Sequence, residues 1–128
     1  RALLDALHER GVQVLLPVVL PDMDLDWAVY EPDALQEVRG LDEPVGARLG
    51  VDAVRTSDVV LVPGLAVSPT GQRLGQGGGC YDRALARIGD VPVAVVLHPE
   101  EVGLDVPVEA HDRPVTHALT AAGVTPLG

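Results

Sequence analysis

The sequence contains no lysine, no phenylalanine and no asparagine, and it has a single cysteine, Cys80. One cysteine cannot form an internal disulfide, so the sequence predicts a reducing, cytoplasmic setting. Apolar runs that could span a membrane are absent, and no signal peptide is evident. Without phenylalanine, the interior must be built mainly from valine, leucine and alanine, which contribute to a hydrophobic content of 47%.

Basic residues are also scarce, and all nine of them are arginine, against nineteen aspartate and glutamate residues. The resulting formal charge of −10 argues against nucleic acid or an anionic membrane as the main partner. It does not exclude a phosphate ligand, because local arginines and a bound cation decide phosphate binding. The length of 128 residues predicts one domain, residues 1–128, with a real core.

Hydrophobic periodicity and turn residues predict an alternation of strands and helices. We expect helices at 1–10, 31–38 and 81–88, strands at 12–20, 25–30, 58–63, 93–97 and 116–119, a hairpin joining 66–67 to 73–74, and a loop over 41–55. The apolar, β-branched strands at 12–20, 58–63 and 93–97 are typical of buried parallel strands. The sequence therefore predicts an α/β fold, with a mostly parallel sheet covered by helices on both faces.

A glycine-rich stretch lies between Arg73 and Asp82, directly before the helix predicted at 81–88. Its glycines are Gly75, Gly77, Gly78 and Gly79. Glycine allows positive φ and close approach of the backbone to a ligand, and the amino end of a helix favours an anion. Arg73 could donate a fork of hydrogen bonds to phosphate, and Asp82 could hold Mg²⁺. The stretch is typical of a nucleotide-phosphate loop.

Two common phosphate loops do not fit this stretch. A P-loop ends in Gly-Lys-Ser/Thr, which a chain without lysine cannot supply. The Rossmann pattern would require its third glycine at the position of Cys80. The structural alternative is a tight glycine turn before a helix, with Arg73 and Asp82 merely solvated.

A longer pattern favours the functional interpretation. The letters VPG at 62–64 and GQRLGQGGGCYD at 71–82 resemble the signature of the 5-formyltetrahydrofolate cyclo-ligase, or methenyltetrahydrofolate synthetase, family. The resemblance extends backwards to LLPVVLPDMDLDWAVY at 15–30 and forwards to LDVPVEAHDRPVTHALT at 104–120. It covers nearly the whole chain, and its motif fixes the spacing of Arg73, Tyr81 and Asp82 as well as the glycines.

The resemblance implies a three-layer α/β fold of the sugar isomerase and CoA-transferase type. It also implies an ATP- and Mg²⁺-dependent ligase that converts 5-formyltetrahydrofolate to 5,10-methenyltetrahydrofolate and releases ADP and phosphate. In that reaction the formyl oxygen attacks the γ-phosphate of ATP, and N10 then displaces the phosphate. The expected partners are these small molecules, with no nucleic acid or membrane, for a cytoplasmic monomer or weak homodimer.

The same resemblance assigns site residues. Arg73 and Asp82 would be catalytic, and Asp82 and Asp112 would hold Mg²⁺. The ATP-binding set would be Arg73, Leu74, Gly75, Gln76, Gly77, Gly78, Gly79, Cys80 and Tyr81. The folate-binding set would be Gln76, Gly77, Gly78, Gly79, Cys80, Tyr81 and Trp27.

Each assignment has a structural alternative. Asp82 could complement the helix dipole, and Asp112 could be a solvated loop acid. Tyr81 could simply pack in the core, and a lone tryptophan such as Trp27 is more often a core or interface residue. Cys80 has no fixed histidine partner in sequence, so we interpret it as a packed thiol and not as a nucleophile.

The chain also departs from the family pattern. Many members carry lysine or arginine among the glycines, where Gln76 and Gly78 are neutral, and an aromatic residue in place of Cys80. Members also carry an N-terminal segment whose Lys and Arg reach ATP and whose Glu contacts the folate. No stretch of this chain matches that segment, so we expect residues 1–128 to lack it and to be weak or inactive alone.

Two other function classes stay open. One is an inactive nucleotide- or folate-binding module, which a turnover assay would distinguish from an enzyme. The other is a phosphosugar isomerase or CoA-transferase-like enzyme on the same scaffold. Isomerases of that type usually rely on a catalytic lysine or a carboxylate pair, and lysine is absent here.

Overall fold

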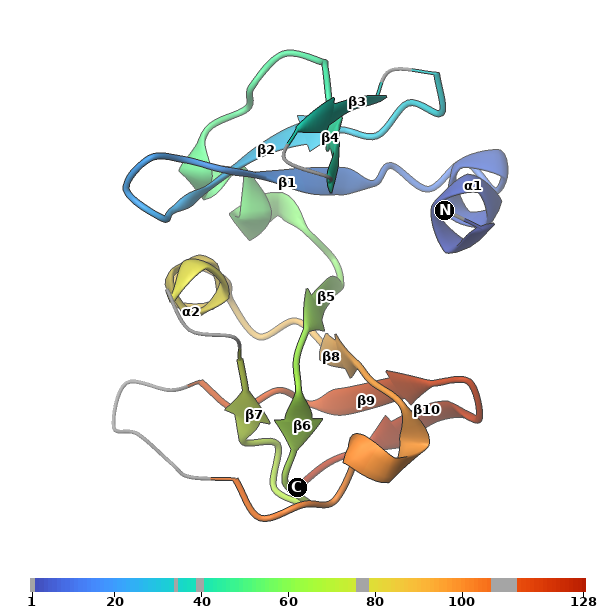
Figure 1. Ribbon diagram of the computed structural model, residues 1–128, viewed down its shortest axis with the longest axis vertical. Coiled ribbons are helices and arrows are strands. Elements are labelled where there is room, and N and C mark those ends of the chain that lie inside the picture. Colours follow the sequence, from blue (N-terminus) through green and yellow to red (C-terminus); the bar gives the residue numbers. More distant parts are fainter. Residues whose placement is uncertain (1, 34, 39–40, 76–78, 107–112) are drawn as a thin grey trace.

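The computed structural model describes residues 2–33, 35–38, 41–75, 79–106 and 113–128. Within these ranges the chain forms two α-helices, two 3₁₀ helices and ten strands (Figure 1). In chain order they are α1 (Ala2–Glu9), β1 (Leu15–Val19), β2 (Leu25–Val29), β3 (Leu35–Val38), β4 (Leu41–Pro44), η1 (Val51–Thr56), β5 (Val60–Pro63), β6 (Ala66–Val67), β7 (Arg73–Leu74), α2 (Cys80–Leu85), β8 (Val93–Val96), η2 (Pro99–Glu101), β9 (His117–Thr120) and β10 (Gly123–Pro126).

The largest sheet has four strands in the order β10-β9-β8-β5. Strands β5, β8 and β9 are parallel, and β10 is antiparallel to β9. The strands predicted at 58–63, 93–97 and 116–119 are confirmed here, and so is a mixed α/β fold that contains parallel strands. Alternation along β5 buries Val60 and Val62 and exposes Leu61 and Pro63, as expected for the two faces of a pleated strand.

The first strand pairs in a different way from the prediction. The run at 12–20 was expected to form a buried parallel strand, but β1 is antiparallel to β2, with Pro17 opposite Trp27. The prediction of a parallel strand is therefore wrong, while the strand predicted at 25–30 is confirmed. The reason is the connection, because residues 20–24 are too few for the crossover that parallel strands require.

The stretch from 31 to 55 contains more regular structure than its sequence indicates. The predicted helix at 31–38 is wrong, because β3 pairs with β4 as an antiparallel hairpin. The loop predicted over 41–55 is also wrong in part, since it includes β4 and most of η1. A helix of about eight residues is marginal by itself. Pairing with a neighbouring strand satisfies the same backbone groups and overrides local propensity.

One hydrophobic core connects the two halves of the molecule seen in Figure 1. It joins side chains from β2, η1, β5, β6, α2, β8 and β9. The members that are less than 2% exposed include Leu25, Val54, Leu85 and Val95. The predicted helix at 81–88 is confirmed as the shorter α2, which contributes Ala84 and Leu85 to this core.

Arg113 closes the carboxyl end of α2. Its guanidinium donates hydrogen bonds to the carbonyl oxygens of Leu85 and Ile88 from Nη1, at 2.9 and 2.8 Å, and to that of Gly89 from Nη2, at 2.6 Å. A cation at this end of a helix also complements the partial negative charge of the last carbonyls. Helix α2 is therefore held in position by the packing of its apolar face and by the hydrogen bonds of Arg113 at its carboxyl end.

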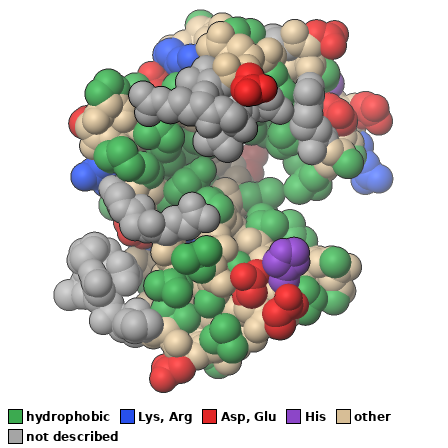
Figure 2. Space-filling view, viewed as in Figure 1, with side chains coloured by type: hydrophobic (Ala, Val, Ile, Leu, Met, Phe, Trp, Pro, Cys, Tyr) green, Lys and Arg blue, Asp and Glu red, His purple; other side chains and the backbone are tan. Residues whose placement is uncertain are grey.

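The outer helix and one sheet face leave apolar side chains in contact with solvent. Helix α1, which confirms the helix predicted at 1–10, buries none of its residues fully, and Leu3 is 49% exposed. Leu61 and Val96 on the four-stranded sheet are also exposed. Figure 2 shows hydrophobic side chains across much of the face in view.

Candidate functional site

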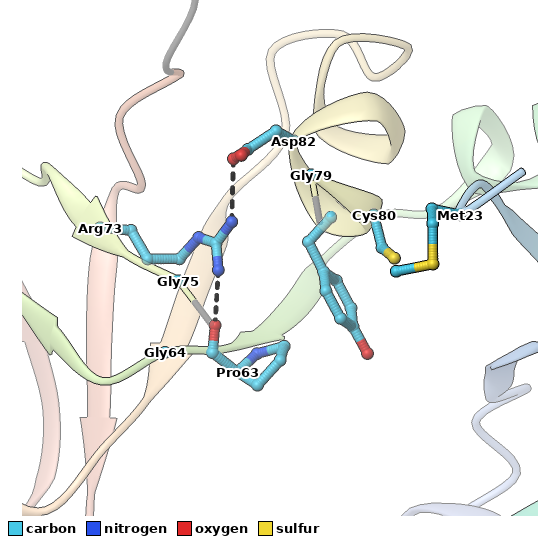
Figure 3. A pocket seen from close by; sticks show the side chains of 9 residues that line it. Met23, Pro63, Gly64, Arg73, Gly75, Gly79, Cys80 and Asp82 are labelled. Atoms are coloured by element: carbon cyan, nitrogen blue, oxygen red, sulfur yellow. Dashed lines mark hydrogen bonds and ion pairs between the residues drawn. The ribbon is translucent and has the colours of Figure 1, made fainter. Parts of the chain in front are cut away.

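A pocket of about 280 Å³ opens where the end of β5, the strand β7 and the start of α2 meet. Nine residues line it, namely Met23, Pro63, Gly64, Arg73, Gly75, Gly79, Cys80, Tyr81 and Asp82. Eight of them belong to the motif at 62–64 and 71–82, and six of these eight were predicted as site residues. Figure 3 shows how Arg73 and Asp82 lie at one side of the pocket, with Cys80 and Met23 at the other.

Arg73 is the cation of the pocket wall. Its Nη2 donates to Oδ1 of Asp82 at 2.9 Å, and its Nη1 donates to the carbonyl oxygen of Pro63 at 2.9 Å. The side chain is only 7% exposed. Its Nε is buried and has no hydrogen-bond partner among the described residues. A buried donor without a partner is costly, so the Arg73 side chain holds one donor that the described residues leave unused.

Two glycines make room for the Arg73 side chain. A Cβ atom built on Gly64 would lie 2.7 Å from Cγ2 of Val95 and 3.3 Å from Cγ of Arg73. A Cβ atom on Gly75 would lie 3.0 Å from Nη1 of the same arginine. The absence of side chains at both positions therefore leaves room for the Arg73 guanidinium on the pocket wall. Sequence analysis assigned Gly75 to the ligand and did not select Gly64.

Gly79 starts the helix that carries Asp82. It has φ of +70°, in the left-handed region that favours glycine, and its carbonyl oxygen accepts the N–H of Arg83 at 3.1 Å. The Asp82 side chain in the first turn of α2 is 35% exposed. Its carboxylate is thus accessible from the pocket while one oxygen is held by Arg73.

Cys80 and Tyr81 are half-buried and pack against the hydrophobic core. Burial raises the pKa of the Tyr81 phenol above its ordinary value, so this side chain is neutral at physiological pH. Together the two residues give the pocket an apolar side opposite its charged pair. The packing of Cys80 agrees with its interpretation as a packed thiol.

The pocket also includes a residue that sequence analysis missed. Met23 comes from the turn between β1 and β2, far from the motif in sequence, and the turn is fixed to α2 and the residues after it. Arg87 binds Asp24 through two hydrogen bonds of 2.7 and 2.6 Å. The hydrogen bond from Arg87 lowers the pKa of Asp24 to about 2, and the same pairing raises the pKa of Arg87.

Other predicted site residues lie elsewhere or outside the described residues. Leu74 is on β7 and does not line the pocket. Trp27 is 6% exposed in the core and does not line it either, so its assignment as a folate contact stays a prediction. The remaining four, Gln76, Gly77, Gly78 and Asp112, lie outside the described residues.

The described carboxylates can supply part of a Mg²⁺ site. No group of three or more His, Cys, Asp or Glu residues is placed to hold a metal ion in the described ranges. Mg²⁺ is commonly bound by one or two carboxylates together with substrate phosphates and water. Asp82, with a carboxylate in the pocket beside an arginine, fits such a shared site. The second predicted ligand, Asp112, is not described.

No helix in the described part of the chain has the length and apolar character needed to cross a bilayer.

Sequence comparison relates this chain to one family of enzymes. The profile of the 5-formyltetrahydrofolate cyclo-ligase family matches residues 1–121. A 5-formyltetrahydrofolate cyclo-ligase of Mycolicibacterium smegmatis is 41% identical over 126 residues, which cover 93% of this chain and 65% of that protein. The Escherichia coli K12 protein of the same name is 31% identical over 128 residues, or 95% of this chain and 70% of the relative.

Solved structures give the same relationship. The NMR structure of Aquifex aeolicus 5,10-methenyltetrahydrofolate synthetase superimposes with a TM-score of 0.74 at 30% identity, covering 97% of this chain and 64% of that one. A synthetase from Mycoplasma pneumoniae gives a TM-score of 0.63 at 19% identity, which supports the fold alone. The chain thus spans less than two thirds of the length of its Mycolicibacterium and Aquifex relatives.

Proposed function

This chain belongs to the 5-formyltetrahydrofolate cyclo-ligase family, and we propose that it carries the phosphoryl-transfer site of that reaction. The reaction converts 5-formyltetrahydrofolate to 5,10-methenyltetrahydrofolate, uses ATP and Mg²⁺, and releases ADP and phosphate. The observation that carries the proposal is the position of Arg73. Its nearly buried guanidinium lies on the pocket wall between Pro63 and Asp82, with an Nε donor that lacks a partner among the described residues.

The proposal includes the finer fold class, a three-layer α/β arrangement of the sugar isomerase and CoA-transferase type. The parallel strands β5, β8 and β9 support it, as does the packing of α2 against the sheet. In α/β sheets, ligands bind beyond the carboxyl ends of the strands. The pocket occupies such a place, because Pro63 ends β5 and Gly64 follows it directly.

Arg73 and Asp82 would have different roles at the transferring phosphate. Phosphoryl transfer depends on in-line positioning and on stabilising the charge of the phosphate oxygens. Arg73 would donate to those oxygens and so orient the γ-phosphate. Backbone N–H groups of the glycine loop would add further donors. Asp82 and Asp112 would hold Mg²⁺, which would supply positive charge to stabilise the phosphate oxygens.

The present pairing of Arg73 with Asp82 has a consequence for ligand binding. The N–H of Nη2 that binds Asp82 is not free for a phosphate oxygen, but Nη2 carries a second N–H. We propose that this second N–H would donate to the phosphate, and that Asp82 would be one of the residues that hold the cation. In the absence of ligand, the 2.9 Å pair keeps both charges compensated.

The proposal is tested by turnover in the full-length protein. We expect 5-formyltetrahydrofolate to be converted to the methenyl product, followed by its near-ultraviolet absorbance, only when both ATP and Mg²⁺ are present. Arg73→Met should lower kcat by about 10²- to 10³-fold, the usual effect of losing one donor to a charged transition state. Arg48→Met is the matched control, because Arg48 is exposed and, among the described residues, donates only to the carbonyl oxygens of Pro44 and Gly46.

Two results would contradict the proposal. Equal product without ATP would show that the reaction is not driven by phosphoryl transfer. Binding of ATP or folate without any turnover would instead identify an inactive binding module.

A further inference from the structure

The turn between β1 and β2 holds a methionine in a backbone conformation that favours glycine. Met23 has φ of +69°, and it is the one non-glycine residue with positive φ among those described. Its N–H donates to the carbonyl oxygen of Leu20 at 2.9 Å, and the N–H of Leu20 donates to that of Asp24 at 2.9 Å. Hairpin loops of this kind usually place glycine at the left-handed position. A glycine at this position would adopt the same φ without backbone strain, so the Met23 side chain is present at a cost in conformational energy.

The Met23 side chain lines the pocket and is not a core residue. It is 43% exposed, and it belongs to the same pocket wall as Cys80 and Tyr81. Figure 3 shows the side chains of Met23 and Cys80 directed toward one another. Packing does not explain why this accessible apolar side chain is held at a strained backbone position. A contact with a ligand in the pocket would explain it.

The residues on both sides of Met23 are fixed by arginines from the segment that carries Asp82. Arg83 donates to the carbonyl oxygen of Asp22 at 2.9 Å. Arg87 forms two charged hydrogen bonds with Asp24, and the two side chains are 21% and 14% exposed. Two-point pairs of this geometry are among the stronger ion pairs in proteins. The distance between Met23 and the phosphate side of the pocket is thereby fixed.

We propose that Met23 contacts the flat, conjugated ring of the folate and helps to set specificity for it, while Arg83 and Arg87 are positioning residues that hold Met23 in place. The inference rests on the proposed function. The pocket has a charged side at Arg73 and Asp82, suited to phosphate, and an apolar side at Met23, Cys80 and Tyr81. A thioether is polarizable and packs well on aromatic faces, so the ring belongs at the apolar side.

The direct test is Met23→Gly in the full-length protein, with Met23→Leu as the conservative variant. Glycine should relieve the strained backbone, so the melting temperature should stay equal or rise. Loss of the side chain should raise KM for 5-formyltetrahydrofolate about tenfold. We expect KM for ATP and kcat to change by less than about twofold, and leucine to restore most of the affinity. A purely structural role for Met23 predicts no rise in KM, and that result would overturn the inference.

The positioning role is tested by a double-mutant cycle. Asp24→Asn and Arg87→Met should each raise KM for the folate, and the double variant should be no worse than Arg87→Met, because Arg87 pairs with Asp24 and its Nε also lies 3.9 Å from Oδ1 of Asp52. Arg48→Met is the control, because Arg48 is exposed and, among the described residues, donates to the carbonyl oxygens of Pro44 and Gly46. Additive effects, or equal rises in KM for ATP, would overturn the positioning role.

The outcomes separate this inference from the proposed function. Wild-type protein that neither turns over nor binds 5-formyltetrahydrofolate in a calorimetric titration would overturn both. Normal wild-type turnover with unchanged folate KM in Met23→Gly would overturn only the inference.

Discussion

At the scale of single residues, the pocket is organised by one arginine and the space left around it. A Cβ atom on Gly64 or Gly75 would crowd the Arg73 side chain, which reaches Asp82 and Pro63. The glycines of this motif therefore leave space for the arginine, in addition to the role toward a phosphate ligand that we propose. This explains why Gly64 and Gly75, which do not directly precede a helix, belong to the same motif.

Asp82→Asn removes the charge that would attract Mg²⁺ but keeps the shape of the side chain and an oxygen that can accept from Arg73. We expect the fold to remain intact and Mg²⁺-dependent turnover to fall by about 10²- to 10³-fold. The measurement is kcat as a function of Mg²⁺ concentration. Asp58→Asn, an exposed carboxylate away from the pocket, is the control. An unchanged Mg²⁺ dependence would mean that Asp82 only complements the helix dipole.

Gly64→Ala places a methyl group where Val95 and Arg73 already lie. Because its Cβ would be 2.7 Å from the Val95 side chain, we expect a loss of stability of about 1–3 kcal/mol. The shift of Arg73 should also weaken ATP binding, measured by calorimetry with a non-hydrolysable analogue. Gly89→Ala is a matched control, since a Cβ atom there meets nothing within 4 Å. If both variants bind the analogue equally well, Arg73 does not depend on the space at Gly64.

At the scale of elements, α2 joins the hairpin β1–β2 to the four-stranded sheet. Its inner face packs in the core, Arg113 closes its carboxyl end, and Arg83 and Arg87 hold the hairpin turn. The helix has only six residues and would not be stable alone. Tertiary contacts therefore stabilise the element that presents Asp82.

The pairing of Asp24 with Arg87 makes this junction sensitive to acid. The pKa of Asp24 is lowered from 3.8 to about 2, so the folded state favours its charged form. The pair should contribute about 1–2 kcal/mol above pH 3.8, and this contribution should vanish as the pH falls toward 2. We expect Asp24→Asn to lower the free energy of unfolding by that amount at pH 7, measured in urea. The gap to wild type should narrow below pH 4, and a gap independent of pH would contradict the pairing.

At the scale of the whole molecule, we propose that residues 1–128 behave as a single domain, because one continuous core includes side chains from both halves. Trp27 on β2 and Val95 on β8 belong to the same cluster, although they lie in different halves of the molecule. Shared burial of this kind couples the unfolding of the two halves.

We therefore expect one cooperative thermal transition for the 128-residue chain. Trp27 is its only tryptophan, so fluorescence reports on the first half, while far-ultraviolet circular dichroism reports on both. The two midpoints should coincide. A fluorescence transition that precedes the loss of secondary structure would show that the hairpins at residues 15–44 unfold separately.

Local patterns allowed much of the fold and the site to be predicted. The helices at 1–10 and 81–88, the strands at 58–63, 93–97 and 116–119, and the grouping of Arg73 with Asp82 all follow from short-range signals, such as periodicity, turn residues and motif spacing. The errors concern pairing. The run at 12–20 has the composition of a parallel strand, and residues 31–38 could form a helix, but each is decided by a neighbouring strand.

The sequence by itself determined the composition of the site, because its glycines, Arg73, Tyr81 and Asp82 lie within a few residues of one another. Only the tertiary structure brought Met23 to the same pocket and placed Arg87 on Asp24, 63 positions away in the chain. Such contacts depend on how the elements pack together, and packing is governed by the shapes and pairing of distant segments. Local sequence signals do not show which distant segments come into contact, so the contribution of Met23 to the pocket could be found only in the folded chain.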